Sequence, residues 1–121
     1  QAPGFPNMLT LVGPHNASTF CNIPRCIEQN VEWVSDLLAF MYKEGLETVE
    51  AASEDAASWV EHSEEMVSMT LIPTTDSWFM NVNQNLPEKK RTFLAYAGGA
   101  PRYKQKCDEV AEAGYTGFIF S

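Results

Sequence analysis

The feature that most constrains the fold is a continuous helical stripe of apolar residues in the first half of the chain. Its members follow at steps of four, three, four and three, widened by three further apolar residues: Ile27, Val31, Val34, Leu38 and Met41, with Trp33, Leu37 and Phe40. This spacing recurs once per helical turn and predicts a helix whose stripe faces a core. Asn22 can cap its start, Pro24 suits its first turn and Gly45 can end it. We therefore expect a helix over residues 24–44.

The rest of the chain predicts two more helices and a few short strands around a long loop. One helix is expected to begin after Ser53 and to fade near residue 71, and another to span Pro101–Ala113 before a stop at Gly114. Short apolar runs between turn residues predict strands at Met8–Val12, Thr92–Tyr96 and Tyr115–Phe120. The irregular stretch 74–91 is long for a compact domain, and such loops are often functional. The expected fold class is α/β, mostly helical with a few short strands.

Charge and composition limit the partners of this chain. Its net charge is −8, with 16 acidic against 8 basic residues, whereas binding nucleic acid requires a basic face. No apolar run approaches the roughly 20 residues of a transmembrane helix. The opening residues Gln1-Ala2-Pro3-Gly4 do not form a secretory signal, because no basic stretch precedes an apolar one. We expect a cytoplasmic protein with neither nucleic acid nor a membrane as a partner.

The cysteines and histidines do not have the spacing of a metal site or of a disulfide framework. Cys21, Cys26 and Cys107 are odd in number and unpatterned, which argues against a framework and favours a reducing compartment. His15 and His62 stand far apart, so no zinc site and no other metal centre is expected. The triplet 16–18 (Asn-Ala-Ser) matches a glycosylation acceptor, which we expect to be coincidental.

Common catalytic and nucleotide-binding motifs are also missing from this sequence. There is no GxGxxG fingerprint, no P-loop after Gly98-Gly99 and no GxSxG nucleophile elbow. The adjacent pair Glu64-Glu65 points in two directions on a helix and is expected to be surface charge. The residues alone therefore indicate a soluble α/β piece with an unusual loop.

Three ordered segments, however, resemble one known family over nearly the whole chain. The first runs from Gly4-Phe5-Pro6-Asn7-Met8 through Gly13-Pro14, Ser18 and Asn22 to Ile27–Trp33; the second holds Asp76-Ser77-Trp78-Phe79, Asn83, Pro87 and Arg91-Thr92-Phe93; the third holds Gly98-Gly99, Arg102-Tyr103, Cys107–Ala111 and Gly114–Phe118. Their order and spacing resemble the final part of flavin-dependent Baeyer–Villiger monooxygenases of the phenylacetone, steroid and cyclohexanone type.

The resemblance implies the C-terminal piece of a flavoprotein with two Rossmann-like dinucleotide domains, one for FAD and one for NADPH. Residues 1–45 would end the FAD-binding domain with a strand, a flavin-side loop and a helix. Residues 46–121 would form a C-terminal helical segment, a mobile Trp loop and closing strands. Such an enzyme uses molecular oxygen to convert a ketone into an ester or lactone. The family's glycine fingerprints and catalytic Arg have no counterpart here, so this piece alone is expected to be inactive.

The resemblance also carries a few binding residues onto this chain, but no catalytic residue. Ile23 matches a position, usually Met, whose backbone approaches the flavin of FAD, although its side chain could equally be plain core. Ser18, Thr19 and Phe20 match a bulge that lines the ketone pocket, where an apolar wall with a few polar groups is required. Trp78 matches a mobile-loop Trp that contacts NADP, although it could instead be a hydrophobic anchor of its loop.

Several departures from the family pattern leave other functions open. Asn81-Val82-Asn83 stands where the family usually has Gly-Ala-Asn, and about two extra residues precede Arg91, which puts the closed conformation of the loop in question. The chain could be a stand-alone binding or interaction module without redox activity, or part of a related flavin N-oxygenase. In a Baeyer–Villiger monooxygenase or in an N-oxygenase, a sheet outside this chain would cover Met8–Val12 and the helical stripe. Exposing this apolar surface in the isolated chain favours aggregation.

Overall fold

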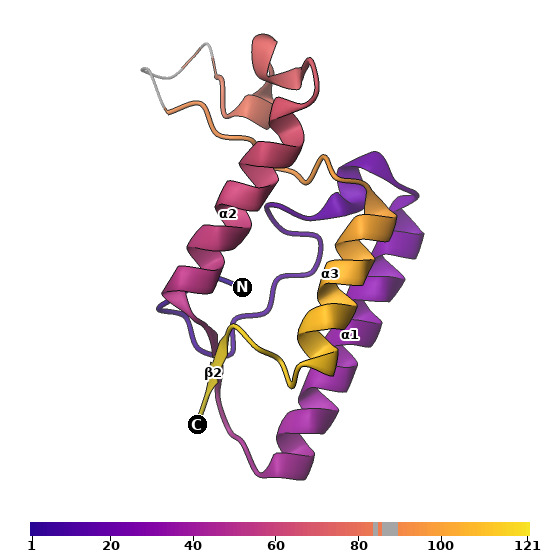
Figure 1. The fold of residues 1–121 in the computed structure, drawn as a ribbon, viewed down its shortest axis with the longest axis vertical. Coiled ribbons are helices and arrows are strands. Elements are labelled where there is room, and N and C mark those ends of the chain that lie inside the picture. Colours follow the sequence, from indigo (N-terminus) through magenta and orange to yellow (C-terminus); the bar gives the residue numbers. More distant parts are fainter. Residues whose placement is uncertain (84, 86–89) are drawn as a thin grey trace.

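The computed structural model describes residues 1–83, 85 and 90–121 of the chain. Its described part contains helices α1 (Ile23–Glu44), α2 (Ser53–Ser68) and α3 (Ala100–Glu112), strands β1 (Val49–Ala51) and β2 (Phe118–Phe120), and three 3₁₀ turns: η1 (Ala17–Phe20), η2 (Ile72–Thr74) and η3 (Trp78–Met80). In Figure 1, α3 lies along α1, while α2 stands across the N-terminal segment from them. A mostly helical piece with short strands is the fold class that the sequence predicts, and it is confirmed.

Helix α1 begins and ends where its capping residues predict. Asn22 accepts a hydrogen bond from the backbone N–H of Arg25 through its side-chain oxygen at 3.3 Å, and Gly45 ends the helix in the left-handed conformation at φ 71°. The predicted start, Pro24, lies one residue inside the observed one. The helix is therefore specified locally, by its ends, as well as by its apolar pattern.

The apolar residues predicted for α1 divide between the core of this chain and an exposed side. The buried residues of this helix are Cys26, Asn30, Leu37 and Met41, with Trp33 and Phe40 partly buried beside them. Most of the predicted stripe, at Ile27, Val31 and Leu38, is exposed. The helix therefore carries two apolar faces, and the face that holds Trp33 packs against the rest of this chain. Trp33 packs edge-on against Tyr115, with 5.3 Å between ring centres, and its indole N–H donates a hydrogen bond to the Cys107 carbonyl of α3 at 2.8 Å.

The closing strand pairs with a strand that the sequence did not predict. β2 pairs antiparallel with β1, with Val49 opposite Phe120 and Ala51 opposite Phe118. The prediction of a strand over residues 115–120 is thus confirmed for its last three residues. β1 is only three residues long, and although its burial alternates, it is shorter than the run of about four residues over which alternation indicates a strand. In the view of Figure 1 the strand β2 of this pair lies at the lower left, above the level of the last turn of α1.

The two other predicted strands are wrong in detail. The described residues 8–12 are irregular, because Val12 adopts a positive φ of 55° and only Leu9 of this run packs on the core. Residues 92–96 are extended but form isolated hydrogen bonds, from Leu94 N–H to the Phe79 carbonyl at 2.8 Å and from Tyr96 N–H to the Asn16 carbonyl at 3.1 Å. Their neighbours are a short turn and a loop, which offer too few carbonyls for a regular ladder.

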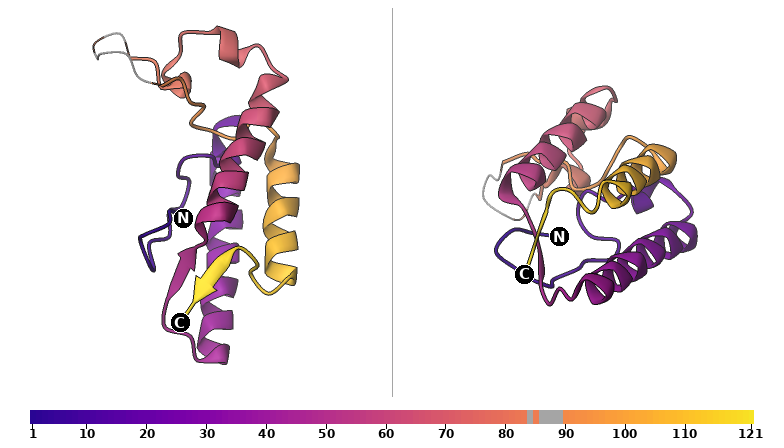
Figure 2. Two further views of the ribbon diagram at one scale, coloured as in Figure 1. Left: turned by 60° about the vertical axis from the view of Figure 1, so that its left-hand side comes forward. Right: turned by 60° about the horizontal axis from the view of Figure 1, so that its bottom comes forward.

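The other two helices are confirmed, with ends that differ from the predicted ones by one to three residues. α2 begins at Ser53 itself, the residue after which it was expected to begin, and ends at Ser68, before the predicted residue 71; its capping position is Ala52, which makes no side-chain cap bond. Met66 and Val67 of α2 are buried in two clusters that also hold Phe93 and Tyr96. In Figure 2 the N-terminal segment reaches β1, where the Asn7 backbone N–H donates to the Val49 carbonyl at 2.9 Å. Among the described residues, no helix combines the length and apolarity needed to cross a membrane.

Candidate functional site

The residues carried over for the flavin and ketone sites lie together, from η1 to the first turn of α1. Ser18 is buried, and its backbone N–H donates a hydrogen bond to the Asn16 side-chain oxygen at 2.9 Å. Thr19 and Phe20 are exposed, and Phe20 stacks on Phe93 with ring centres 6.3 Å apart. The bulge therefore has one anchored residue followed by two that face out of the core of this chain.

Ile23 is turned away from the core of this chain. Its side chain is 53% exposed, directly after the Asn22 cap at the start of a 22-residue helix. The alternative that Ile23 is a plain core residue is therefore not what the structure shows for this chain. Its position leaves the backbone at the helix start and the apolar side chain open to a further group.

Trp78 is likewise an exposed residue on an anchored loop. It lies in η3 with its side chain 70% exposed, and among the described residues its one aromatic contact is with its neighbour Phe79, at 4.3 Å between ring centres. The buried residue of this turn is Met80, which joins a core cluster with Val67 and Phe93. Met80, rather than Trp78, is therefore the hydrophobic anchor of the loop, and the indole is available for contact.

Arg91 ties the loop before Trp78 to the extended segment that follows it. Its guanidinium donates to the Asp76 carboxylate at 2.7 Å, to the Thr75 carbonyl at 2.6 Å and to the Pro73 carbonyl at 3.2 Å. A planar guanidinium can make several such bonds at once, whereas an ammonium acts as a point charge. Arg91 was predicted only as part of the family pattern, with no role.

The Asn81 departure is explained by backbone conformation. Asn81 has φ 58° and ψ 22°, in the left-handed region that glycine adopts freely and asparagine tolerates. An Asn where the family usually has Gly therefore preserves the turn that ends η3. The predicted two extra residues before Arg91 fall mainly on positions 84 and 86–89, which lie outside the described residues.

A buried polar network behind η1 was missed by the sequence analysis. The Asn16 amide donates to the Asn30 side-chain oxygen at 2.7 Å and to the Tyr103 hydroxyl at 3.0 Å. Burial raises the pKa of Tyr103 well above its usual value, so its phenol stays protonated. One signal was available, since Asn30 is a polar residue on the inward side of an apolar helix. Because the Asn16 amide is buried and engaged, it is also not accessible for glycosylation in this fold.

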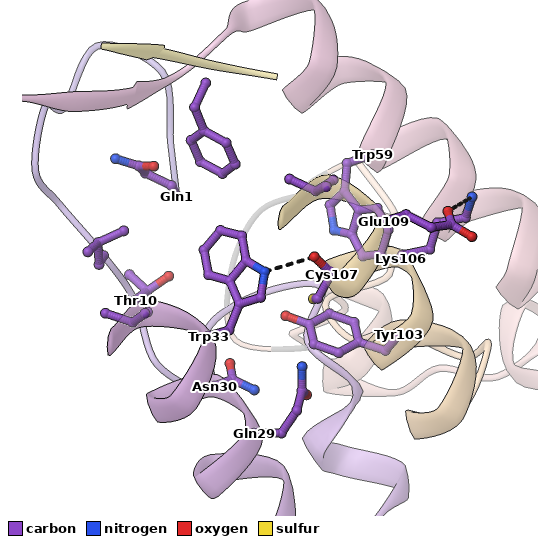
Figure 3. A pocket seen from close by; sticks show the side chains of 14 residues that line it. Gln1, Thr10, Gln29, Asn30, Trp33, Trp59, Tyr103, Lys106, Cys107 and Glu109 are labelled. Atoms are coloured by element: carbon purple, nitrogen blue, oxygen red, sulfur yellow. Dashed lines mark hydrogen bonds and ion pairs between the residues drawn. The ribbon is translucent and has the colours of Figure 1, made fainter. Parts of the chain in front are cut away.

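The network borders a cavity of about 360 Å³ between the N-terminal segment and the helices. Figure 3 shows Trp33, Trp59, Tyr103 and Cys107 converging on it. Burial raises the pKa of the Cys107 thiol, which disfavours its thiolate form. None of the predicted site residues lines this cavity, so the structure separates it from the η1 and Trp78 surfaces.

Two of the three cysteines lie close together. The sulfur atoms of Cys21 and Cys26 are in contact at the start of α1, with their Cα atoms 6.8 Å apart, and Cys107 is free. A single close pair of cysteines five residues apart is not a disulfide framework, and the pair has no spacing that marks it in the sequence. Within the described residues, no group of three or more potential metal ligands comes together.

Comparison with characterised proteins shows close relatives of more than one activity. The chain is 38% identical to an acetone monooxygenase (methyl acetate-forming) of Gordonia sp. over 119 residues, which is 98% of this chain and 22% of that protein. It is 36% identical to a Baeyer–Villiger monooxygenase of Pseudooceanicola batsensis, over 95% of this chain and 20% of that protein. It is also 36% identical to a phenazine N-monooxygenase of Lysobacter antibioticus, over 96% and 21%. No protein-family model matches the chain.

Solved structures agree with these relatives. The chain superposes on the OTEMO complex with FAD and NADP with a TM-score of 0.88 and 35% identity, covering 100% of this chain and 21% of that one. A closed structure of cyclohexanone monooxygenase gives a TM-score of 0.88 and 36% identity, covering 99% and 22%. The chain thus spans about a fifth of the length of its relatives and matches their C-terminal portion.

Proposed function

Because this chain belongs to the Baeyer–Villiger monooxygenase family and matches its C-terminal portion, we propose that it is part of an enzyme that uses FAD, NADPH and molecular oxygen to insert an oxygen atom into ketones. The product would be an ester or lactone. The observation that carries this proposal is the match over nearly the whole chain, in sequence and in three dimensions, to monooxygenases whose structures hold FAD and NADP. In this reading residues 1–45 end the FAD-binding domain and residues 46–121 form a C-terminal segment.

The residues of this chain fit a supporting role at the two cofactors. Side chains that would meet a cofactor are left exposed by the core, while their backbones are held in place. Ile23, at the start of α1, would present its backbone and an apolar side chain to the flavin. Trp78 would offer NADPH a stacking face and one N–H donor, which suits a ribose hydroxyl. Bound FAD would supply the redox chemistry, while the protein supplies position and field.

The ketone pocket would take one wall from η1. Phe20 provides apolar surface and Thr19 a hydroxyl, and both lie on the exposed side of the turn. Ser18 holds the turn from behind through its hydrogen bond to Asn16. The turn thus has one anchored residue, Ser18, and two exposed ones, Thr19 and Phe20. Such a wall can orient a small apolar substrate beside the flavin and keep water out.

A second candidate function is oxidation of nitrogen rather than of a ketone carbon. The phenazine N-monooxygenase, at 36% identity, is as similar to this chain as the Baeyer–Villiger enzyme of P. batsensis. Both chemistries use the same cofactors, so the residues of this piece that face the cofactors would serve either. The two candidate functions therefore differ only in the substrate that is oxidised, a ketone or a nitrogen compound.

A substrate comparison tests the proposal. The full-length protein containing these residues would be supplied with NADPH and either ketones or aromatic N-heterocycles, and products would be identified by mass spectrometry. We expect esters or lactones from ketones. Oxidation of nitrogen with no ester formed would favour the second function. Absence of flavin from a well-folded protein would instead favour a binding module without redox activity.

A further inference from the structure

Asn16 is the point at which four separate parts of the chain are joined. Its amide nitrogen donates to Asn30 of α1 and to Tyr103 of α3, at 2.7 and 3.0 Å, and its side-chain oxygen accepts from the N–H of Ser18 in η1 at 2.9 Å. Its backbone carbonyl accepts from the N–H of Tyr96 at 3.1 Å. Both side-chain donors and the side-chain acceptor of this asparagine are thereby used.

The network has only one good arrangement, because its members are buried. Asn16, Ser18 and Asn30 are all buried, and Asn30 is itself fixed by a bond from its amide to the Cys26 carbonyl at 2.7 Å. A buried amide that loses a partner keeps the cost of its lost hydration, so alternative rotamers are strongly disfavoured. The position of Ser18 is therefore set from behind by α1 and α3.

The turn η1 depends on this support, because it has little of its own. It is four residues long, and its closing bond, from Cys21 N–H to the Ser18 carbonyl, is long at 3.4 Å. Phe20 leans on Phe93 at 6.3 Å between ring centres, but Thr19 and Phe20 otherwise face outward. Where these two side chains stand is determined mainly by where Ser18 is held.

We propose that Asn16 and Tyr103 are positioning residues that hold the wall segment Ser18–Phe20, and that through it they set which ketones the enzyme accepts. The specificity role rests on the proposed function, whereas the holding role rests on the hydrogen bonds alone. In this role both residues act through Ser18 rather than by contact with substrate or cofactor. Tyr103 and Asn30 line the cavity, whereas Thr19 and Phe20 do not.

The test uses the full-length protein that contains these residues. Tyr103→Phe removes the hydroxyl that accepts from Asn16 and keeps the ring, and Asn16→Asp keeps the shape but removes both donors. The matched control is Tyr42→Phe, on a side chain of α1 that is 91% exposed. Hydrogen–deuterium exchange of residues 18–20 reports on the turn without any substrate. The ratio of kcat/KM for a small acyclic and a bulky cyclic ketone reports on selectivity.

We expect Tyr103→Phe to accelerate exchange at residues 18–20 by about tenfold, the upper range for the loss of one hydrogen bond, and Asn16→Asp, which loses two donors, to accelerate it at least as much. We also expect the ketone ratio to change by about threefold or more, with FAD content and the KM for NADPH unchanged and with Tyr42→Phe like the wild type. Unchanged exchange would overturn the holding role. Faster exchange with an unchanged ratio of kcat/KM would overturn the specificity role, because a purely structural defect lowers kcat/KM for both ketones by the same factor. A wild type that oxidises no ketone would overturn the proposed function, while the exchange data still decide the holding role.

Discussion

At the scale of single residues, the exposed indole of Trp78 gives the sharpest test of cofactor contact. Because its side chain is 70% exposed and Met80 anchors its loop, Trp78→Ala should leave the melting temperature almost unchanged. Loss of a stacking face and an N–H donor should cost about 1.5 kcal/mol, or roughly tenfold in the KM for NADPH. Leu71→Ala, on another exposed apolar residue of the same region, is the control. A variant that melts several degrees lower with an unchanged KM would show an anchor instead.

Cys107 gives a second residue-level prediction. Burial is the largest cause of its raised thiol pKa, so the neutral thiol persists to higher pH than in an exposed cysteine. Because the thiolate is the reactive form, alkylation by iodoacetamide should be slow at pH 8 and should rise only as the pH increases further. The rate is measured by mass spectrometry on the peptide containing Cys107, with the urea-unfolded protein as the reference. Equal rates in the folded and unfolded protein would contradict the burial of this thiol.

At the scale of elements, the loop that carries Trp78 should depend on Arg91. Removing the guanidinium leaves the carbonyls of Pro73 and Thr75 without a donor, so Arg91→Ala should raise the KM for NADPH several-fold while the FAD content stays the same. Arg91→Lys should restore the pairing with Asp76 but not both carbonyl bonds, and recover only part of the effect. Lys104→Ala, which removes another surface ion pair, should have no effect. Equal kinetics for both Arg91 variants and the wild type would argue against this role.

Sequence predicted the elements that are specified locally and missed those that depend on neighbours. The helix α1 carries its own cap at Asn22 and its own stop at Gly45, so its bounds are recovered. The extended segment 92–96 has the composition of a strand, but whether it forms a ladder depends on what lies beside it. For the same reason, the exposed states of Ile23 and Trp78 required the structure, because hydrophobicity alone does not say which partner a side chain meets.

At the scale of the whole molecule, the surface of α1 predicts how the isolated chain behaves. An exposed apolar stripe runs along this helix and consists of Ile23, Ile27, Val31 and Leu38. A helix that is covered on two sides in a larger protein has such a second apolar face. Expressed alone, the 121 residues should therefore be poorly soluble or molten, although their net charge is −8. Circular dichroism melting and size-exclusion chromatography check this. A sharp, cooperative melt of a monomer would count against it.

A charge placed on this stripe should improve the solubility of the isolated chain but lower the stability of the full-length protein. Val31→Glu should make the isolated chain more soluble, because it interrupts an exposed apolar surface. In the full-length protein the same change should destabilise by about 2–3 kcal/mol, since it would bury a charge beneath a covering element. Glu32→Gln, on an exposed neighbouring position, is the control. Improved or unchanged stability in the full-length protein would mean that nothing covers this stripe.

Ketone oxidation by the full-length protein tests the central claim most directly. The protein containing these residues would be purified, its flavin absorbance recorded, and NADPH consumption and ester formation measured with and without a ketone. We predict bound flavin, ketone-dependent NADPH consumption and one ester or lactone per NADPH consumed, while the 121 residues alone show none of these. Activity of the isolated chain, or a full-length protein that binds flavin but forms no ester from any ketone, would contradict the account.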